Sequence, residues 1–370
     1  MQITVLGGAG GMGSRAVKDI AGQKDVTKVI IGDLDFNAAQ KYAEELNEAM
    51  GTEKVEPVYV DANHAATVAK AISGSTAVAS AIGPYYKFGH MVVENALEAG
   101  ASIVDICDDY DAVEDILSLD KKAKSKGVTV LTGMGWTPGL SNMLAVKGIN
   151  ELDDTREVYI YWAGSPLGDS GMAVILHTLH IFSGNIPTFK DGKLENIPAG
   201  SEPEKVNFFD MPRCTMYHVG HPEPVTMGRF LPNLDKVVLK GGLTEDSLNK
   251  FLLGLNKSGL SEIKGNKDRI GKIVKKLTPL LNTLKQAKGE TRSAIKVEIK
   301  GTKDGKETLI TYEANADMAD LTGIPLAIGT LMLAREQTGK SGVYPPEAII
   351  DSNEFLSELE NRNIRTHRTT

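Results

Sequence analysis

Residues 2–13 read Gln2-Ile-Thr-Val-Leu-Gly-Gly-Ala-Gly-Gly-Met-Gly13, a short apolar run that passes directly into a glycine-rich turn. The run from Ile3 to Leu6 has the composition of a buried strand, and a helix is predicted from Met12 to Ile20. A strand, a glycine-rich turn and a helix in this order are typical of the first unit of a parallel α/β sheet. This stretch therefore predicts an α/β fold.

The glycines of the turn fit two spacings of one phosphate-binding motif. GxGxxG falls on Gly8, Gly10 and Gly13, and GxxGxxG falls on Gly7, Gly10 and Gly13. In both cases one glycine makes the tight turn, one lets the backbone approach a pyrophosphate, and one lets helix pack on strand. The helix N-terminus adds unpaired N–H groups. We expect six residues of the turn to bind a dinucleotide: Gly7, Gly8, Gly10, Gly11, Met12 and Gly13.

An acidic residue stands where such a motif requires one. Asp33 ends the second predicted strand, 20 residues past Gly13, where a carboxylate can bind both hydroxyls of a ribose. The same carboxylate would repel the 2′-phosphate of NADP, and the residues from Leu34 to Asn37 include no arginine. We therefore predict NAD rather than NADP as the cofactor. The alternative is a structural turn followed by a surface aspartate.

The rest of the chain continues the pattern and then changes it. Residues 1–138 alternate six short apolar runs with helical segments, which predicts a Rossmann doubly wound parallel sheet. Residues 139–319 predict an α+β domain on a mostly antiparallel sheet, with loop residues dominating 183–210, and residues 320–370 form a C-terminal segment. Two turns are expected within hairpins, at Asp191-Gly192 and at Asp304-Gly305.

Composition and charge exclude several classes of partner. A net charge of −7 argues against nucleic acid and anionic membranes, which require a basic surface. The chain has only two cysteines, no apolar run long enough to span a membrane, and a strand rather than a leader pattern at its start. We expect a cytoplasmic protein with a small-molecule substrate.

Polar and aromatic residues follow two neighbouring strands of the predicted sheet. Gly83, Pro84 and Tyr85 follow the fourth strand, where the carboxyl edge of the sheet faces the nicotinamide half of a dinucleotide. We expect them to contact the cofactor, although an aromatic residue packed under a loop is an equal alternative for Tyr85. At the end of the fifth strand, Asp105 is a candidate base and Asp109 a candidate ligand for a substrate ammonium; capping of the next helix is the alternative.

The second domain supplies histidines and arginines. His177 and His180 are three residues apart on a predicted helix, and His218 and His221 repeat that spacing. No cysteine or acid completes a familiar zinc motif, so no metal is predicted. We expect His221, supported by His218, to handle protons, and three residues to bind the substrate: His177, Arg213 and Arg229.

Three further stretches resemble the saccharopine dehydrogenase family. They are Ile82 to Asp109, with Gly-Pro-Tyr after one strand and Val-Asp at the end of the next; Gly133-Met-Gly-Trp-Thr-Pro-Gly-Leu-Ser-Asn142; and Gly342-Val-Tyr-Pro-Pro-Glu347. The last resembles the lysine 6-dehydrogenase branch, as do Phe230-Leu-Pro-Asn-Leu and Lys303-Asp-Gly-Lys-Glu-Thr. The resemblance implies a C-terminal segment that returns to the Rossmann domain, a substrate site between the domains, and a homodimer.

The same resemblance implies the activity. It indicates an NAD(P)-dependent oxidoreductase acting on a C–N bond of an amino acid or related amine, of the saccharopine dehydrogenase or lysine 6-dehydrogenase type. Two alternatives stay open at this point: a polyamine-pathway reductase of the carboxynorspermidine dehydrogenase kind, and a protein that senses NAD without turnover. Polar residues gathered in the second domain favour an enzyme over a sensor.

Overall fold

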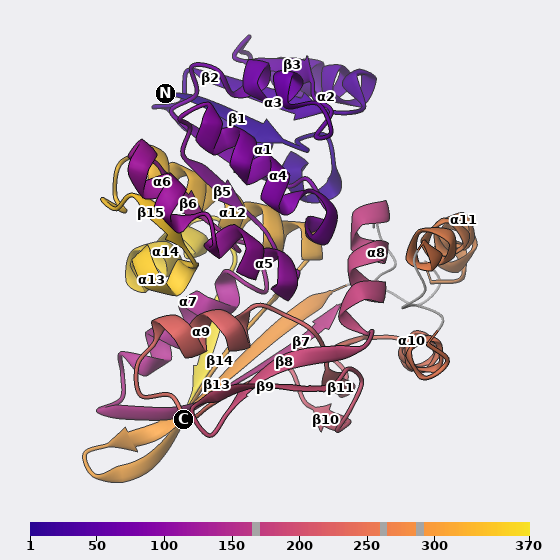
Figure 1. Cartoon of the computed structure of the whole chain (residues 1–370), viewed down its shortest axis with the longest axis vertical. Helices are drawn as coiled ribbons and strands as arrows, with labels where there is room; N and C mark the ends of the chain where they lie inside the picture. The colour runs from indigo at the N-terminus through magenta and orange to yellow at the C-terminus, as the bar shows by residue number, and fades with distance from the viewer. Residues whose placement is uncertain (165–170, 260–264, 286–291) are drawn as a thin grey trace. The chain divides into compact units, whose positions relative to one another are not determined.

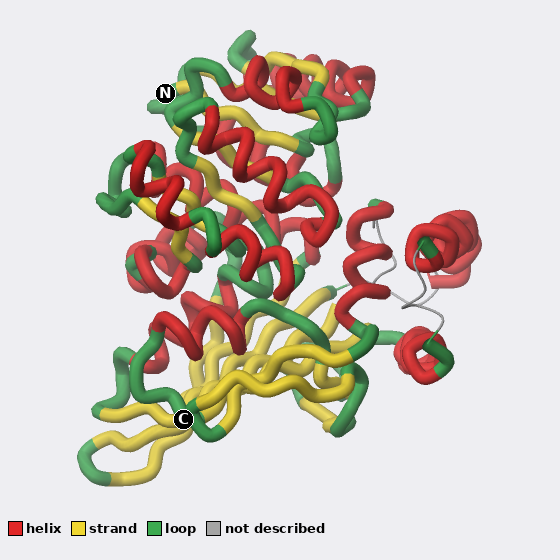
Figure 2. The backbone as a smooth tube through the Cα atoms, in the orientation of Figure 1, coloured by secondary structure: helices red, strands yellow, loops and turns green. Residues whose placement is uncertain are grey.

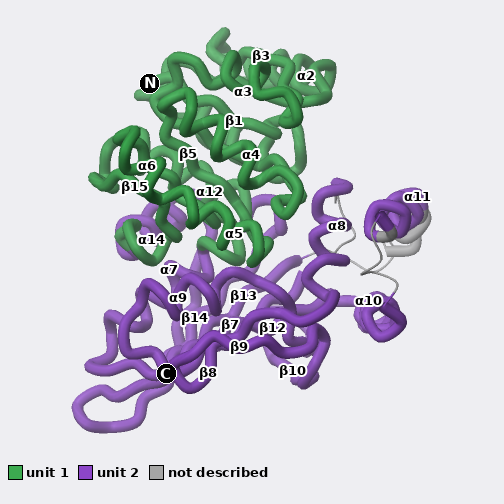
Figure 3. Tube along the Cα trace, viewed as in Figure 1, with its two compact units in different colours: residues 1–139, 322–351 green, residues 140–321, 352–370 purple. Residues whose placement is uncertain are grey.

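A computed structural model describes residues 1–164, 171–259, 265–285 and 292–370 (Figure 1). The chain divides into two compact units, Met1–Gly139 with Thr322–Asp351, and Leu140–Leu321 with Ser352–Thr370 (Figure 3). The first boundary between the units falls after Gly139. The C-terminal segment behaves differently from the expectation, because only its first part returns to the first unit and its last 19 residues belong to the second.

Seven parallel strands form the sheet of the first unit, in the order β15-β6-β5-β4-β1-β2-β3. Six of them come from the N-terminal part: β1 (Gln2–Leu6), β2 (Lys28–Asp33), β3 (Val55–Tyr59), β4 (Ala77–Ser80), β5 (Ile103–Asp105) and β6 (Thr129–Leu131). Their order reverses between β1 and β4, which is the switch point at which Rossmann sheets bind nucleotides. The predicted doubly wound sheet is confirmed.

Helices cover both faces of this sheet (Figure 2), so β1, β4 and β5 consist almost wholly of buried residues. The helix ends follow local chemistry: the side chain of Asp35 accepts a hydrogen bond from Ala38 at the start of α2, and Gly51 ends that helix in the left-handed region. The helices of the first unit are α1 (Gly11–Gly22), α2 (Phe36–Met50), α3 (Ala65–Ile72), α4 (Tyr85–Glu98), α5 (Tyr110–Leu117), α6 (Asp120–Lys126) and α13 (Pro346–Ile349), with most of α12 (Met318–Ala334).

The seventh strand, β15 (Gly342–Tyr344), comes from the C-terminal segment and pairs with β6 at the edge of the sheet. This pairing explains why part of the segment belongs to the first unit. The last strand, β16 (Thr366–Thr369), instead pairs with β14 (Lys306–Ala316) in the second unit. The C-terminal segment thus contributes one edge strand to each sheet.

A mixed sheet dominates the second unit, in the order β10-β11-β12-β7-β13-β14-β16, with β8 and β9 attached to β12. Among the described strands of this second sheet, only β12 and β7 pair in parallel, and the other pairs are antiparallel. The predicted mostly antiparallel sheet is therefore confirmed. The remaining strands are β7 (Asp154–Gly164), β8 (Asn185–Lys190), β9 (Lys193–Pro198), β10 (Glu204–Val206), β11 (Cys214–His218), β12 (Lys236–Leu243) and β13 (Ser293–Lys303).

Both predicted hairpins are present. Asp191 and Gly192 join β8 to β9, Asp304 and Gly305 join β13 to β14, and all four have positive φ, as such tight turns require. The expectation that loops dominate residues 183–210 is wrong, since β8, β9 and β10 lie there. Strand β9 is almost entirely exposed and carries no alternating apolar pattern, so the sequence held no strand signal for it.

Helix α7 (Leu140–Ile149) packs closely on the second sheet, where a Cβ at Gly148 would lie 2.5 Å from Ile299 Cδ1. The other helices of this unit are α8 (Met172–Ile181), α9 (Glu223–Phe230), α10 (Asp246–Lys257), α11 (Asn266–Lys285) and α14 (Ser352–Glu360). None of the helices in the described ranges has both the length and the apolar composition to cross a bilayer.

Candidate active site

The glycine-rich turn has the geometry that its sequence predicts. Gly7 has φ of +73° and donates its N–H to Gly32 O at 2.7 Å, and a Cβ at Gly13 would lie 2.1 Å from Gly7 O. Helix α1 begins immediately afterwards with Gly10 as its N-cap, and no side chain in the described part of the chain caps it. The turn therefore leaves the N-terminus of α1 to a ligand that accepts hydrogen bonds, such as a pyrophosphate.

Asp33 lies at the end of β2 beside this turn. Its Oδ2 accepts the N–H of Ala9 at 3.0 Å, and its Oδ1 accepts the N–H of Asp35 at 3.0 Å. These two bonds fix the carboxylate in place and use about half of its capacity, because a carboxylate offers roughly four acceptor sites. The remaining sites are available to two ribose hydroxyls.

Tyr85 occupies a different position from the one expected of a cofactor contact. It is 5% exposed, its hydroxyl donates to Ser80 O at 2.8 Å, and the same oxygen accepts the N–H of Ile106 at 3.3 Å. Burial raises the pKa of this phenol well above its usual value. Its side chain joins β4 to β5 beneath the loop, which is the packing alternative; Gly83 and Pro84 precede α4 at the end of β4.

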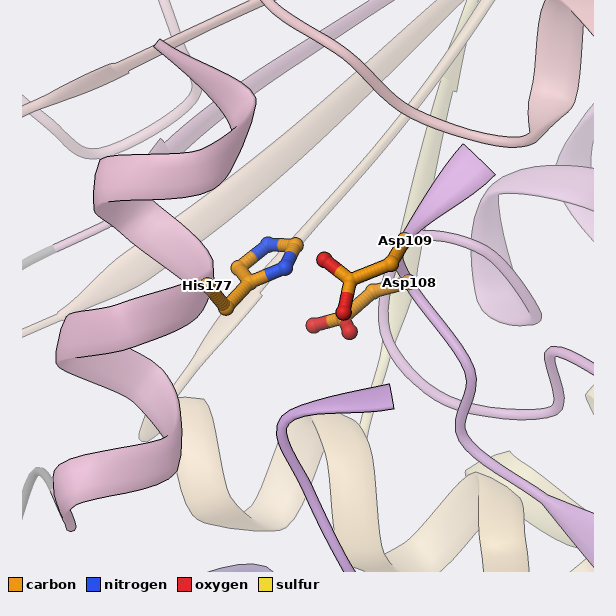
Figure 4. Close-up of side chains that lie close together, drawn as sticks. All are labelled: Asp108, Asp109 and His177. Atoms are coloured by element: carbon orange, nitrogen blue, oxygen red, sulfur yellow. The ribbon is translucent and has the colours of Figure 1, made fainter. Parts of the chain in front are cut away.

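Asp105 ends β5 and Asp109 follows it, and both carboxylates accept hydrogen bonds from backbone N–H groups. Oδ1 of Asp105 accepts hydrogen bonds from Cys107 N, Gly133 N and Thr132 Oγ1 at 2.9, 2.9 and 3.0 Å. The residue is 1% exposed, and burial raises the pKa of its carboxyl to about 6. Asp109 is also buried and accepts the N–H of Tyr86 at 2.9 Å. Figure 4 shows Asp108 and Asp109 beside each other in the loop between β5 and α5.

In the second unit, His221 is buried and packs against two other aromatic rings. It is 2% exposed, and its ring centroid lies 5.6 Å from that of Trp162 on β7 and 5.4 Å from that of His177. His177 projects from α8 (Figure 4) and meets the His221 ring edge to face, at 90°. The tertiary structure thus joins one histidine from each of the two sequence pairs.

Glu223 is a further buried residue of this group, and the sequence analysis did not single it out. Its side chain is completely buried, its Oε2 lies 3.7 Å from Nδ1 of His221, and its Oε1 accepts the hydroxyl of Ser141 at 2.7 Å. A signal was available, because the stretch His221-Pro-Glu-Pro224 places an acid two residues from a candidate base.

The other two histidines have separate partners. Nε2 of His218 lies 3.2 Å from Oε2 of Glu202, and burial is the main cause that lowers the pKa of this imidazole. Nδ1 of His180 lies 2.8 Å from Nζ of Lys267 on α11. The expected pairing of His218 with His221 as one proton-handling unit is therefore not what the side-chain contacts show.

Arg213 and Arg229 flank the second histidine pair in the sequence. Both are exposed, and Arg213 precedes β11 whereas His218 ends it. Since a strand advances about 3.3 Å per residue, the five steps between them amount to about 16 Å. Arg213 Nη2 donates to Lys205 O at 3.5 Å, and the guanidinium of Arg229 lies 5.4 Å from the Phe230 ring centroid in the last turn of α9.

A Rossmann sheet with a glycine-rich turn, an uncapped helix N-terminus and a fixed carboxylate defines a dinucleotide-binding protein. A second unit with a buried imidazole and carboxylate adds groups suited to proton transfer. Together these features define the class as a nicotinamide-dependent oxidoreductase with a separate substrate domain.

Comparison with known proteins specifies the family. The saccharopine dehydrogenase NADP binding domain matches residues 3–131, and the saccharopine dehydrogenase C-terminal domain matches residues 135–364. Carboxyaminopropylagmatine dehydrogenase of Synechocystis sp. is 22% identical over 399 residues, covering 99% of this chain and 97% of the relative. Saccharopine dehydrogenase (L-Glu forming) of Saccharomyces cerevisiae has a similar structure, with a TM-score of 0.68, 16% identity and complete coverage of both chains.

The chain belongs to the saccharopine dehydrogenase family. It is an enzyme, an NAD(P)-dependent oxidoreductase acting on a C–N bond of an amino acid or related amine. The expectation drawn from the family resemblance is confirmed, and the alternative of a sensor without turnover is set aside. A further solved structure, the DAP dehydrogenase of C. glutamicum in complex with DAP, matches with a TM-score of 0.49 and 14% identity over 98% of this chain and 99% of that one.

Proposed function

We propose that this protein is an NAD-dependent dehydrogenase that oxidises a C–N bond of a carboxylated amine, or forms that bond in the reverse direction. The observation that carries the proposal is the buried imidazole of His221, set among Trp162, His177 and Glu223 in the second unit of a dinucleotide-binding chain. A base with an ordinary pKa near neutrality is what the removal of an amine proton requires.

The choice of NAD rests on Asp33. Its carboxylate is fixed by two backbone N–H groups at the end of β2, where the adenine ribose of a Rossmann cofactor is bound. A 2′-phosphate there would meet a fixed negative charge. The saccharopine dehydrogenase NADP binding domain, which this chain matches, is named for NADP. The proposed preference for NAD is therefore specific to this chain and rests on Asp33.

Each residue has a defined task in the proposed reaction. The turn from Gly7 to Gly13 binds the pyrophosphate, and Gly83 and Pro84 border the nicotinamide end. The bound dinucleotide supplies the hydride acceptor. His221 accepts the proton that leaves the substrate nitrogen, so that the carbon can release its hydride and the C–N single bond becomes a C=N bond. Water then hydrolyses the imine to a carbonyl compound and a free amine.

Asp105 is better suited to positioning than to catalysis. Three donors occupy its Oδ1, and the side chain is buried within the first unit, where it ties the end of β5 to the turn at Thr132 and Gly133. We propose that it shapes this turn. For Arg229, Arg213 and Asp109 we retain the proposed task of binding charged groups of the substrate, with Arg229 binding its carboxylate.

A second candidate substrate class has its own support. The curated relative that matches over 99% of this chain is named for carboxyaminopropylagmatine, which favours the polyamine-pathway alternative over an amino-acid substrate of the lysine 6-dehydrogenase type. Both candidates share one chemistry, an amine that also carries a carboxylate. The active-site residues proposed above serve either of them.

Absorbance at 340 nm tests the proposed function. We expect turnover with NAD or NADH and a carboxylated secondary amine, or with the amine and carbonyl compound from which it forms. Lysine, saccharopine, carboxylated polyamines and plain diamines are compared, each with NAD and with NADP. Turnover of a plain diamine alone, or a preference for NADP, would contradict the proposal.

We also propose a cytoplasmic homodimer. Cys107 and Cys214 are both buried and reduced, which fits a reducing compartment. Sedimentation velocity measures the oligomeric state: a single species of about twice the chain mass is expected, and a monomer at assay concentration would contradict it.

A further inference from the structure

Among the residues that the structure describes in the second unit, Glu223 is a completely buried carboxylate next to the proposed base. Its Oε2 is 3.7 Å from Nδ1 of His221, and both side chains are almost inaccessible to solvent, with 0% and 2% exposed. A carboxylate at this depth is costly unless a cation or hydrogen-bond donors compensate it. The geometry therefore raises the question of what this acid does for the imidazole.

Ser141 holds the other oxygen of that carboxylate. Its hydroxyl donates to Oε1 of Glu223 at 2.7 Å and lies 3.1 Å from Oδ1 of Asn142, and Ser141 is itself fully buried. Glu223 is also the first residue of α9, where the helix dipole favours a negative charge. The hydroxyl and the dipole both favour the ionised form of Glu223, in opposition to burial.

An ionised Glu223 determines which nitrogen of His221 carries the proton. A carboxylate accepts hydrogen bonds only, so the ring nitrogen that faces it is stabilised as N–H. That nitrogen is Nδ1, and the neutral ring then has an unprotonated Nε2. The rings of Trp162 on β7 and His177 on α8 also pack against His221.

We propose that Ser141 and Glu223 form a buried relay that holds His221 in the Nδ1–H tautomer, so that Nε2 accepts the proton of the substrate amine. Glu223 and Ser141 are positioning residues in this relay. The inference rests on the proposed role of His221 as the base and assigns that role to a particular nitrogen.

The proton and charge balance is simple. The proton passes from the substrate nitrogen to Nε2, and the electron pair of the broken N–H bond stays on nitrogen. His221 becomes an imidazolium, whose positive charge faces the carboxylate of Glu223 across the 3.7 Å contact. Glu223 keeps its charge throughout, and in the reverse direction Nε2 returns the proton to the nitrogen.

The native protein itself provides the first test. Two-bond ¹H–¹⁵N NMR spectra of protein labelled with ¹⁵N-histidine distinguish the two neutral tautomers of an imidazole. Because the chain has 7 histidines, the signals of His221 are assigned by their loss in His221→Asn. We expect Nδ1–H for His221 above its pKa. An Nε2–H tautomer in the native protein would overturn the relay.

The second test is the pH profile of Glu223→Gln, which keeps the shape of the side chain and removes its charge. We expect kcat to fall about 10²-fold, because a base with the wrong tautomer loses most of the contribution of a positioned base. The acidic limb of kcat/KM should also move to lower pH, since the imidazolium loses the carboxylate that stabilises it. Ser141→Ala should produce a smaller change of both quantities in the same direction.

Glu151→Gln is the matched control. Glu151 is a hydrogen-bonded glutamate of the same unit, whose partners are Tyr312 and Arg368; its loss should lower the melting temperature and leave the acidic limb in place. If Glu223→Gln lowers the melting temperature alone, the role of Glu223 is structural and the relay is wrong. Glu223→Asp, which keeps the charge, should recover part of the lost turnover.

Two outcomes distinguish a failure of the relay from a failure of the proposed role of His221 as the base. If His221→Ala turns over as fast as the native enzyme, the proposed base is wrong, and the relay is overturned with it. If His221→Ala is inactive while Glu223→Gln keeps both its rate and its acidic limb, the base stands and only the relay is wrong.

Discussion

At the scale of single residues, Gly10 and Gly13 lie in one turn but differ in their tolerance of a side chain. A Cβ at Gly10 would contact only Gly7 O, at 3.3 Å, and its backbone has φ of −73°, which any residue adopts. A Cβ at Gly13 would lie 2.1 Å from the same oxygen. The first glycine therefore serves the ligand, and the second serves the packing of α1 on β1.

This difference predicts opposite effects. Gly10→Val should weaken dinucleotide binding about 10-fold or more, since 1.4 kcal/mol of lost contact is tenfold, and should leave cooperative melting intact. Gly13→Ala should destabilise the fold by about 1–3 kcal/mol through overpacking. Calorimetric titration and thermal melting measure the two effects, with Gly22→Ala as the control because a Cβ there meets nothing within 4 Å. Unchanged affinity in Gly10→Val would place the phosphates elsewhere.

The carboxylate of Asp33 should determine the preference of the enzyme for NAD over NADP. The substitution Asp33→Ser removes the charge that opposes a 2′-phosphate, and Leu34→Arg adds a cation that can bind it. The side chain of Leu34 is 63% exposed, so its replacement does not disturb the core. The ratio of kcat/KM for NADP over NAD should rise at least about 10-fold, since like-charge contacts cost several kcal/mol. A native enzyme that already prefers NADP would contradict the argument.

The buried carboxyl of Asp105 should make the free energy of unfolding depend on pH. Burial raises the pKa of its carboxyl from 3.8 to about 6, so the folded state binds its proton more tightly than the unfolded state does. Its stabilising contribution is complete below pH 4 and is lost as the pH rises to about 6; at roughly 1.4 kcal/mol per pKa unit the change is about 3 kcal/mol. Asp105→Asn should flatten the pH dependence of the free energy of unfolding between pH 4 and 6. Denaturant melts at several pH values measure it, and an unchanged slope would exclude Asp105 as the source.

At the scale of elements, the register of β7 and β12 positions the aromatic group around His221. Trp162 pairs with Gly241, and a Cβ at Gly241 would lie 2.0 Å from Trp162 Cε2. The indole thus lies directly across the backbone of β12, which only a glycine permits. The strand pairing, and not the local sequence, sets the position of the ring that contacts His221.

Gly241→Ala should therefore displace the indole. We expect a loss of stability of about 1–3 kcal/mol from overpacking, a change in the near-ultraviolet circular dichroism of Trp162, and reduced turnover with dinucleotide affinity retained. Gly254→Ala in α10 is the control in the same unit, because a Cβ there meets nothing within 4 Å. Native turnover in Gly241→Ala would show that the ring is not needed for His221 to act.

At the scale of the whole molecule, the C-terminal segment serves both units. Strand β15 extends the first sheet at β6, and β16 extends the second at β14. The last strand is anchored by side chains as well, since Arg368 pairs with Glu151 at 2.7 Å and the His367 ring stacks on Phe209 at 3.7 Å. One edge of each sheet is therefore formed by residues of the C-terminal segment.

Removal of residues 366–370 tests this arrangement. The deletion should destabilise the second unit by loss of four ladder pairs and of the Arg368–Glu151 ion pair, while dinucleotide affinity stays at the native value. Thermal melting followed with and without NAD measures both. A comparable loss of NAD affinity would show that β16 also supports the first unit.

Much of the first unit was predictable from the sequence, because its elements are local. The glycine-rich turn and the acid at Asp33 lie in one strand–helix–strand unit of about 35 residues. The other strands and helices alternate over similarly short distances along the chain. The hairpins at Asp191-Gly192 and Asp304-Gly305 were predictable for the same reason, since two residues determine each turn.

The contacts between side chains that are distant in the sequence could not be predicted without the three-dimensional structure. Ser141 and Glu223 are 82 residues apart, and His177 and His221 come from different sequence pairs, yet each couple is in contact. Conversely, Arg213 and His218 are close in sequence and are separated by the length of β11. The fold class and the dinucleotide turn were predictable from the amino-acid sequence, because they follow from local periodicity. The proposed proton-handling group required the structure, because packing across strands and helices has no local sequence pattern.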